Sequence, residues 1–282
     1  MGPVEYLAGR ASADARIETL SVGMTADGVS VYLVDDRGST SVLQVSPPKF
    51  PNVILEATHK ITTAREALGE DLGGSIPVPL DQWEVNGISC ALFEAFTPLS
   101  PGRVRRFFQL QKLKIPVLGW LRQIAAIDRG PADEAERCLK AVAECPYETL
   151  HAPALKALDR MANGFFSPRR RVMHGDMTLG NVLLDPSKTR EFMIIDWRGS
   201  EANGYPVFDL VKFAEAVGLR PNALRAELTS HAERLACEIE DSRSYLLTAL
   251  GHIWRNLDQF PPERFAAMAN RNLNTLDAAL HG

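Results

Sequence analysis

Three polar side chains near the middle of the chain have types and spacing suited to chemistry on a phosphate group. Asp176 and Asn181 precede an apolar segment at 182–184, and Asp196 directly follows a second one at 192–195. The Asp-Pro-Ser sequence between the segments is typical of a turn, so the two segments should pair as antiparallel strands. Pairing would bring the three side chains to one end of a hairpin.

That end of the hairpin could hold Mg²⁺. Magnesium binds a few carboxylate or amide oxygens together with waters and substrate phosphates, so Asn181 and Asp196 are the predicted metal ligands. Asp176 then remains available to accept a proton from an attacking hydroxyl. Phosphoryl transfer depends mainly on positioning and charge neutralisation, and these groups are its minimum parts.

Three motifs carry a resemblance to a known family. The sequence at 174–181, His-Gly-Asp-Met-Thr-Leu-Gly-Asn, resembles the HGDxxxxN catalytic loop of the aminoglycoside phosphotransferase and choline kinase-like family, which has a protein-kinase-like fold. Ile-Ile-Asp-Trp at 194–197 resembles the metal-binding segment of that family. The sequence at 204–210 resembles its Gly-x-Pro-x-x-Asp-Leu segment. Together the motifs cover residues 172–210.

The resemblance implies a role for each matching residue. Asp176 would be the catalytic base, and Asn181 and Asp196 would bind the metal. Asp209 would brace the catalytic loop. His174 would pack against the metal-binding segment without transferring protons, and Trp197 is also expected to have a packing role.

The elements that must position these residues follow from apolar periodicity. Alternating apolar residues predict strands at 29–34 and 41–45, joined by a turn that ends in glycine. Helical spacing predicts a helix at 52–68, with Asn52 as its N-cap. A second β unit is predicted at 83–93, with a turn at its Asn-Gly pair.

Beyond a Pro/Gly/Ser-rich connection at 97–102, the pattern becomes helical. The predicted helical segments are 103–127, 132–143, 152–162 and 207–280. Pro116 should break or kink the first of them. We therefore predict an α+β protein with a two-lobed, protein-kinase-like fold. A small β-rich N-terminal lobe, residues 1–97, would cover the nucleotide, and a larger, mainly helical C-terminal lobe, residues 98–282, would carry the catalytic hairpin.

The resemblance also implies where ATP would bind. Gln44 stands on the strand where the family usually carries a lysine for the phosphates, and Glu56 is the candidate for the glutamate that pairs with this position. Backbone groups around Glu94 and Phe96, in the lobe connection, are expected to bind adenine. The segment 22–29 offers two glycines for a loop over the phosphates.

Two functions are open. The first is an ATP- and Mg²⁺-dependent kinase that phosphorylates a small-molecule hydroxyl. The second is a catalytically impaired, kinase-like nucleotide-binding or scaffold protein, which Gln44 favours unless Lys49 or Arg37 substitutes for the lysine. The segment 196–209 is too short for an activation loop that docks a peptide, so a protein substrate is disfavoured.

The acceptor class is also open: an aminoglycoside, a sugar, an amino alcohol or a related metabolite. A polycationic aminoglycoside would require an acidic pocket in the helical lobe. The candidate acidic residues are Asp133, Glu134, Glu136, Glu144, Glu233, Glu238, Glu240 and Asp241.

Composition excludes several other classes. The 282 residues include 31 basic and 35 acidic side chains, which gives a net charge of −4. The chain therefore has no overall positive charge that would attract nucleic acid or anionic lipid. The arginine clusters at 103–106 and 169–171 are interpreted as solvated surface. No apolar run is long enough to span a membrane and no signal peptide is evident, so we expect a cytoplasmic protein. The four cysteines lack the spacing of a zinc site or disulfide framework, and oligomeric state stays open.

Overall fold

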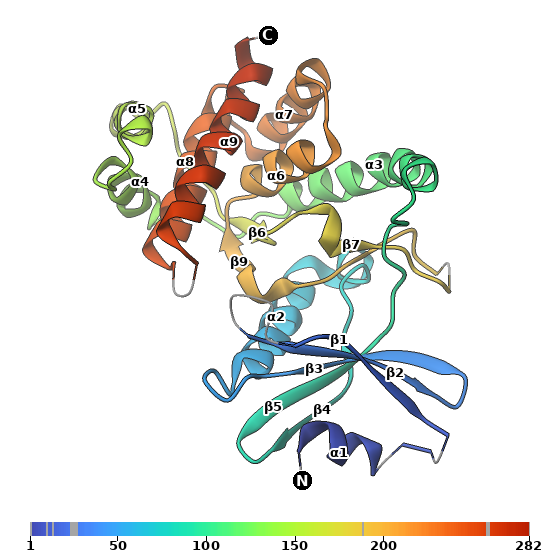
Figure 1. The fold of residues 1–282 in the computed structure, drawn as a ribbon. Helices are drawn as coiled ribbons and strands as arrows, with labels where there is room; N and C mark the ends of the chain where they lie inside the picture. The colour runs from blue at the N-terminus through green and yellow to red at the C-terminus, as the bar shows by residue number, and fades with distance from the viewer. Residues whose placement is uncertain are drawn as a thin grey trace.

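The computed structural model describes residues 2–9, 11–12, 14–22, 28–187, 189–257 and 260–281. A five-stranded antiparallel sheet forms one end of the molecule and helices make up most of the other (Figure 1). The sheet has the order β1-β2-β3-β5-β4. Its strands are β1 (Arg16–Ser21), β2 (Ser30–Asp36), β3 (Ser39–Val45), β4 (Pro79–Val85) and β5 (Ile88–Glu94).

Both predicted hairpins of this sheet are confirmed. Each has a two-residue turn with left-handed backbone at both positions, Arg37-Gly38 (φ 50° and 76°) and Asn86-Gly87 (φ 53° and 75°). Such turns match the twist of the paired strands. β4 begins four residues before the predicted strand, because the alternation of half-buried and exposed side chains already starts at Pro79.

Helices cover both faces of the sheet. α2 (Val53–Gly73) packs against the face that also meets the helical part of the chain, and α1 (Pro3–Ala8) covers the opposite face, where the rings of Tyr6 and Trp83 lie 5.8 Å apart. The predicted helix at 52–68 is confirmed, and a kink follows at Gly69, whose backbone is not helical (φ 72°, ψ 178°), before a short last helical segment to Gly73. The short α1 had no counterpart in the sequence-based prediction.

The start of α2 is capped differently from the prediction. Asn52 occupies the N-cap position, but its side chain makes no capping hydrogen bond. Instead, the Oγ of Ser46 accepts a hydrogen bond from the backbone N–H of Ile54 (3.1 Å), and the Oγ of Ser89 accepts one from Leu55 (3.2 Å). Two serines, one directly after β3 and one in β5, therefore satisfy N–H groups that every helix start leaves open, and they fix α2 to the sheet.

The helical part contains two further pairs of short strands. The predicted hairpin is confirmed as β7 (Val182–Leu183) paired with β8 (Met193–Ile194), while β6 (Arg171–Met173) and β9 (Glu201–Gly204) form a pair that the sequence did not predict. The helices are α3 (Arg103–Ala126), α4 (Ala135–Ala143), α5 (His151–Ala162), α6 (Val207–Val217), α7 (Pro221–Leu235), α8 (Asp241–Arg255) and α9 (Pro262–His281).

Pro116 does not break α3, which continues through it to Ala126; the alternative, a kink, stays a prediction. The expectation for the second arginine cluster was wrong in part. Arg171 is not solvated but only 2% exposed, because its Nε donates to the carbonyl of Ala125 (2.7 Å) and its guanidinium pairs with Asp128.

The β7–β8 hairpin is tied directly to the sheet side of the molecule. Thr97 and Leu184 exchange two backbone hydrogen bonds of 2.9 and 2.8 Å, and the N–H of Ile194 donates to the carbonyl of Ser75 (2.8 Å). The hairpin therefore lies between the sheet and the larger helices, as Figure 1 shows for β7. The division into domains at residue 97 stays a prediction. Of the helices that the structure describes, none has the length and apolar character needed to cross a membrane.

Candidate active site

The loop at 174–181 begins where β6 ends, and its backbone requires glycine at one point. Gly175 has a φ of 84°, and a Cβ there would overlap the carbonyl oxygen of Gly199. Because glycine alone avoids both the strain of positive φ and this overlap, the loop can pass close to the segment that follows Asp196.

A buried carboxylate holds the same loop from α6. Asp209 is 2% exposed, and its two oxygens accept hydrogen bonds from the backbone N–H groups of His174 (2.6 Å) and Gly175 (2.9 Å). Burial raises the pKa of Asp209 to about 7, against the effect of the two hydrogen bonds, which favour the ionised form. These contacts are the ones expected of a residue that braces the loop.

His174 connects the loop to the segment at 194–197, which was predicted to bind the metal. Its Nδ1 accepts from the N–H of Asp176 (3.2 Å), so its Nε2 carries the proton donated to the carbonyl of Ile195 (2.9 Å). Burial lowers the pKa of His174 to about 4. The ring also stands edge-on to the buried Trp197, with 4.7 Å between centroids. A neutral, fully engaged imidazole fits the packing role expected for it.

The three residues proposed for chemistry lie together at one end of the hairpin. Asn181 donates its side-chain N–H groups to the carbonyl (2.8 Å) and the Oδ2 (3.1 Å) of Asp176, while the carbonyl of Asn181 accepts from the N–H of Ile195 (3.0 Å), next to Asp196. Lys212 of α6 lies 3.3 Å from Oδ1 of Asp176. The half-exposed Asp176 is therefore held on both oxygens.

The donor set fits Mg²⁺. Because Asn181 uses its amide nitrogen on Asp176, its amide oxygen stays available for a cation. Burial, reinforced by the charge of Asp176, raises the pKa of Asp196 to about 6, whereas Arg198 pairs with both oxygens (2.7 and 3.2 Å) and favours the carboxylate. Among the described residues, no group of three or more His, Cys, Asp and Glu side chains is arranged so that it could hold a metal ion. Mg²⁺ needs few protein ligands, however, when phosphates and waters supply the rest.

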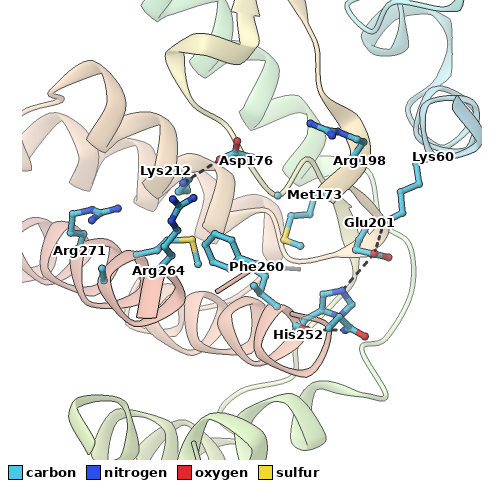
Figure 2. Close-up of a pocket in the computed structure, with 16 residues that line it drawn as sticks. Lys60, Met173, Asp176, Arg198, Glu201, Lys212, His252, Phe260, Arg264 and Arg271 are labelled. Carbon is cyan, nitrogen blue, oxygen red and sulfur yellow. Dashed lines mark hydrogen bonds and ion pairs between the residues drawn. The ribbon is translucent and has the colours of Figure 1, made fainter. Parts of the chain in front are cut away.

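Two cavities meet at this end of the hairpin. A small one of about 90 Å³ lies between β3, β5, α2 and the hairpin, and Asp196 lines it together with three predicted nucleotide residues, Gln44, Glu94 and Phe96. A larger one of about 770 Å³ lies on the other side, and Asp176 lines it. Figure 2 shows Asp176, Lys212 and Arg198 around this larger cavity. Arg198 lines both cavities.

Two other residues that were predicted to act near the nucleotide line neither cavity. Glu56 is exposed on α2 and lines neither cavity, so it does not accompany Gln44. Lys49 is exposed, with its Nζ 5.1 Å from the centroid of the Phe50 ring, and also lines neither cavity. Of the predicted phosphate-covering loop, residues 23–27 lie outside the described part of the chain.

The sequence-based prediction missed the cations around these carboxylates. Arg198 follows Asp196 by two residues in the sequence. Lys212 follows Asp209 by three, a spacing that places Asp209 and Lys212 on one face of α6. These spacings were a usable signal. The contributions of α8 and α9 to the larger cavity had no such signal, because α8 begins 31 residues and α9 52 residues beyond the last motif, which ends at residue 210.

A model of the phosphotransferase enzyme family matches residues 25–237. No curated protein matches the chain significantly in sequence. Among solved structures, a thermostable mutant of aminoglycoside phosphotransferase APH(4)-Ia, in a ternary complex with ADP and hygromycin B, is 17% identical with a TM-score of 0.62 over 100% of both chains.

Two further solved structures resemble the chain. LicA in complex with AMP is 16% identical with a TM-score of 0.54, over 98% of this chain and 96% of the other. A putative fructosamine-3-kinase from Haemophilus somnus 129PT is 11% identical with a TM-score of 0.57, over 93% and 90%. These likenesses confirm the predicted α+β, kinase-like fold.

Proposed function

The chain belongs to the phosphotransferase enzyme family, and we propose that it transfers the γ-phosphoryl group of ATP to a hydroxyl of a small molecule. The observation that carries this proposal is the meeting of Asp176, Asn181 and Asp196 at one end of the β7–β8 hairpin, where two cavities adjoin. A hairpin with only a structural role has no need for this trio, since carboxylates near the interior are costly.

The small cavity is the proposed nucleotide side. Three structural neighbours bind nucleotides, ADP, AMP-PNP or AMP. The cavity is too small to enclose a nucleotide, so ATP would extend from Gln44, Glu94 and Phe96 past Arg198 toward the larger cavity. Gln44 offers a neutral hydrogen bond where the family usually has a lysine, and Arg198 supplies a cation beside it.

The phosphoryl group would be held by Mg²⁺ on Asn181 and Asp196, where the ion neutralises phosphate charge. An acceptor hydroxyl in the larger cavity would give its proton to Asp176. The hydroxyl oxygen then bonds to the γ-phosphorus while the bond from that phosphorus to the bridging oxygen breaks, which releases ADP. Asn181 and Lys212 keep the Asp176 carboxylate oriented for this step.

A thermal-shift titration with ATP tests nucleotide and metal binding separately from turnover. We expect ATP to raise the melting temperature more with Mg²⁺ than without, and Asp196→Ala to remove the Mg²⁺-dependent part. Equal stabilisation in that variant would count against the metal site. A screen of hydroxyl compounds for ADP release then distinguishes the active kinase from the impaired scaffold protein that Gln44 suggests, because the latter binds ATP without turnover.

A further inference from the structure

The walls of the larger cavity are strongly basic. The described residues that line it include five lysines and arginines and a histidine, but only two carboxylates, Asp176 and Glu201. The cationic residues are Lys60, Arg198, Lys212, His252, Arg264 and Arg271. They come from α2, α6, α8, α9 and the segment after β8, so five separate parts of the fold place positive charge around one space.

Both carboxylates in the wall are already engaged. Asp176 is paired with Lys212 (3.3 Å), and Glu201 faces Lys60 (3.3 Å) and His252 (3.8 Å) on a single oxygen. Two further carboxylates behind the wall bind cavity cations: Asp196 pairs with Arg198 and Glu215 with Arg271 (3.0 Å). Even with these included, six cationic groups meet four carboxylates among the described residues.

The histidine adds to the positive charge at neutral pH. A hydrogen bond with Cys138 and then the interaction with Glu201 raise the pKa of His252 to about 9. His252 is therefore protonated near pH 7 and forms a charged group with Lys60 and Glu201 on one side of the cavity (Figure 2).

Arg264 has no evident structural purpose. It is exposed in the first turn of α9, where the helix dipole disfavours a cation. No ion pair of its guanidinium is found within the described ranges, whereas Arg271, two turns further along α9, pairs with Glu215. In Figure 2 the Arg264 side chain extends from α9 toward Lys212 and Asp176. A cation that has no ion pair among the described residues and lines the same cavity as Asp176 favours a ligand that supplies negative charge.

We propose that the acceptor is a hydroxyl compound that carries an anionic group, a phosphate or a carboxylate, which Arg264 binds from α9 while the reacting hydroxyl faces Asp176. This inference rests on the proposed phosphotransferase function and names the substrate class for the same site. Arginine suits either anion because its planar guanidinium donates two parallel hydrogen bonds to phosphate or carboxylate oxygens.

The same charge pattern argues against a polycationic aminoglycoside. None of the acidic residues that the sequence offered for such a pocket, from Asp133 to Asp241, is among the residues lining the larger cavity. Asp176 and Glu201 are the acids found there, and both already have cationic partners. A neutral sugar would leave Arg264 without a counter-charge.

Binding of three probes of similar size and different charge tests this inference: glucose 6-phosphate, glucose and glucosamine, with glucuronate to distinguish carboxylate from phosphate. Thermal shifts are recorded with Mg²⁺ and a saturating non-hydrolysable ATP analogue, so that the nucleotide side is filled. From these thermal shifts, we expect at least one anionic probe to bind with at least tenfold higher affinity than glucose or glucosamine. Arg264→Glu should weaken that binding by at least tenfold.

Arg137→Glu is the matched control, because Arg137 is an exposed helical arginine on α4 that lines neither cavity. It should bind the anionic probe as the wild type does. The inference is overturned if neither anionic probe binds more tightly than the neutral and cationic ones, or if Arg264→Glu binds as tightly as Arg137→Glu. Failure of the proposed function appears separately, as an absence of ADP release in the acceptor screen.

Discussion

Replacement of Asp209 by asparagine should reduce turnover, which depends on the geometry of the loop at 174–181, far more than it reduces folding stability. The carboxylate accepts the N–H groups of His174 and Gly175, whereas an amide keeps one acceptor and turns an N–H donor against the other group. One buried N–H without a partner costs about 1–3 kcal/mol. Loss of a buried charge offsets part of this, because the raised pKa of Asp209, about 7, means that its ionised form is costly at and above neutral pH.

The net loss in unfolding free energy should therefore be about 1–2 kcal/mol, or roughly 2–8 °C in melting temperature for a chain of this size. Turnover should fall much more, since displacement of a catalytic group by about 1 Å can cost about 100-fold. Asp209→Asn is assayed by ADP release and by thermal unfolding.

Asp241→Asn is the control for this prediction. Asp241 is also buried, at 1% exposure, but it binds Arg160 and the N–H of Glu238, away from the site. It should lose at least as much stability while each folded molecule keeps wild-type turnover. Turnover of Asp209→Asn within about twofold of wild type would refute the bracing role.

Three further predictions concern the loop, the metal and helix α2. Gly175→Ala should reduce turnover at least about tenfold, because its Cβ would overlap the carbonyl of Gly199 at a positive φ that itself costs about 1–2 kcal/mol; Gly38→Ala, at a similar φ with open space around it, should keep full turnover. Since burial raises the pKa of Asp196 to about 6, protonation should remove the Mg²⁺-dependent stabilisation by ATP as the pH falls to about 6 and below; a Mg²⁺ effect undiminished at about pH 5 would contradict this. Ser89→Ala should lower the free energy of unfolding by about 1 kcal/mol in urea because it removes a cap of α2, and an unchanged urea midpoint would argue against that cap.

The sequence predicted those parts of the fold that local signals determine. The glycine-containing turns of β2–β3 and β4–β5 specify hairpins by themselves, and the apolar spacing of α2 specifies a helix. Pairing of β6 with β9 could not be foreseen in this way, because each strand is very short and the partners are about 30 residues apart. The cap of α2 was not predicted because its two serines lie in other segments of the chain, one directly after β3 and one in β5.

The candidate site was predictable where it rests on the motifs and unpredictable where it depends on packing. The hairpin brought Asp176, Asn181 and Asp196 together as expected. Glu56 was assigned by analogy with the family's glutamate, whose usual lysine partner is replaced here by Gln44, and the structure leaves Glu56 exposed. Arg264 of α9 lines the cavity because α9 packs against α6, and a single sequence does not determine that packing.

The most direct test of the proposed function is ADP formation from ATP and Mg²⁺ in the presence of an acceptor, compared between the wild type and Asp176→Ala. We expect acceptor-dependent ADP formation by the wild type and a rate at least about 100-fold lower in the variant, because general-base catalysis contributes at least this much. Binding of ATP should be retained in both. Near wild-type turnover by Asp176→Ala would contradict the assignment of the base, and ATP binding without ADP formation by the wild type would contradict the kinase itself.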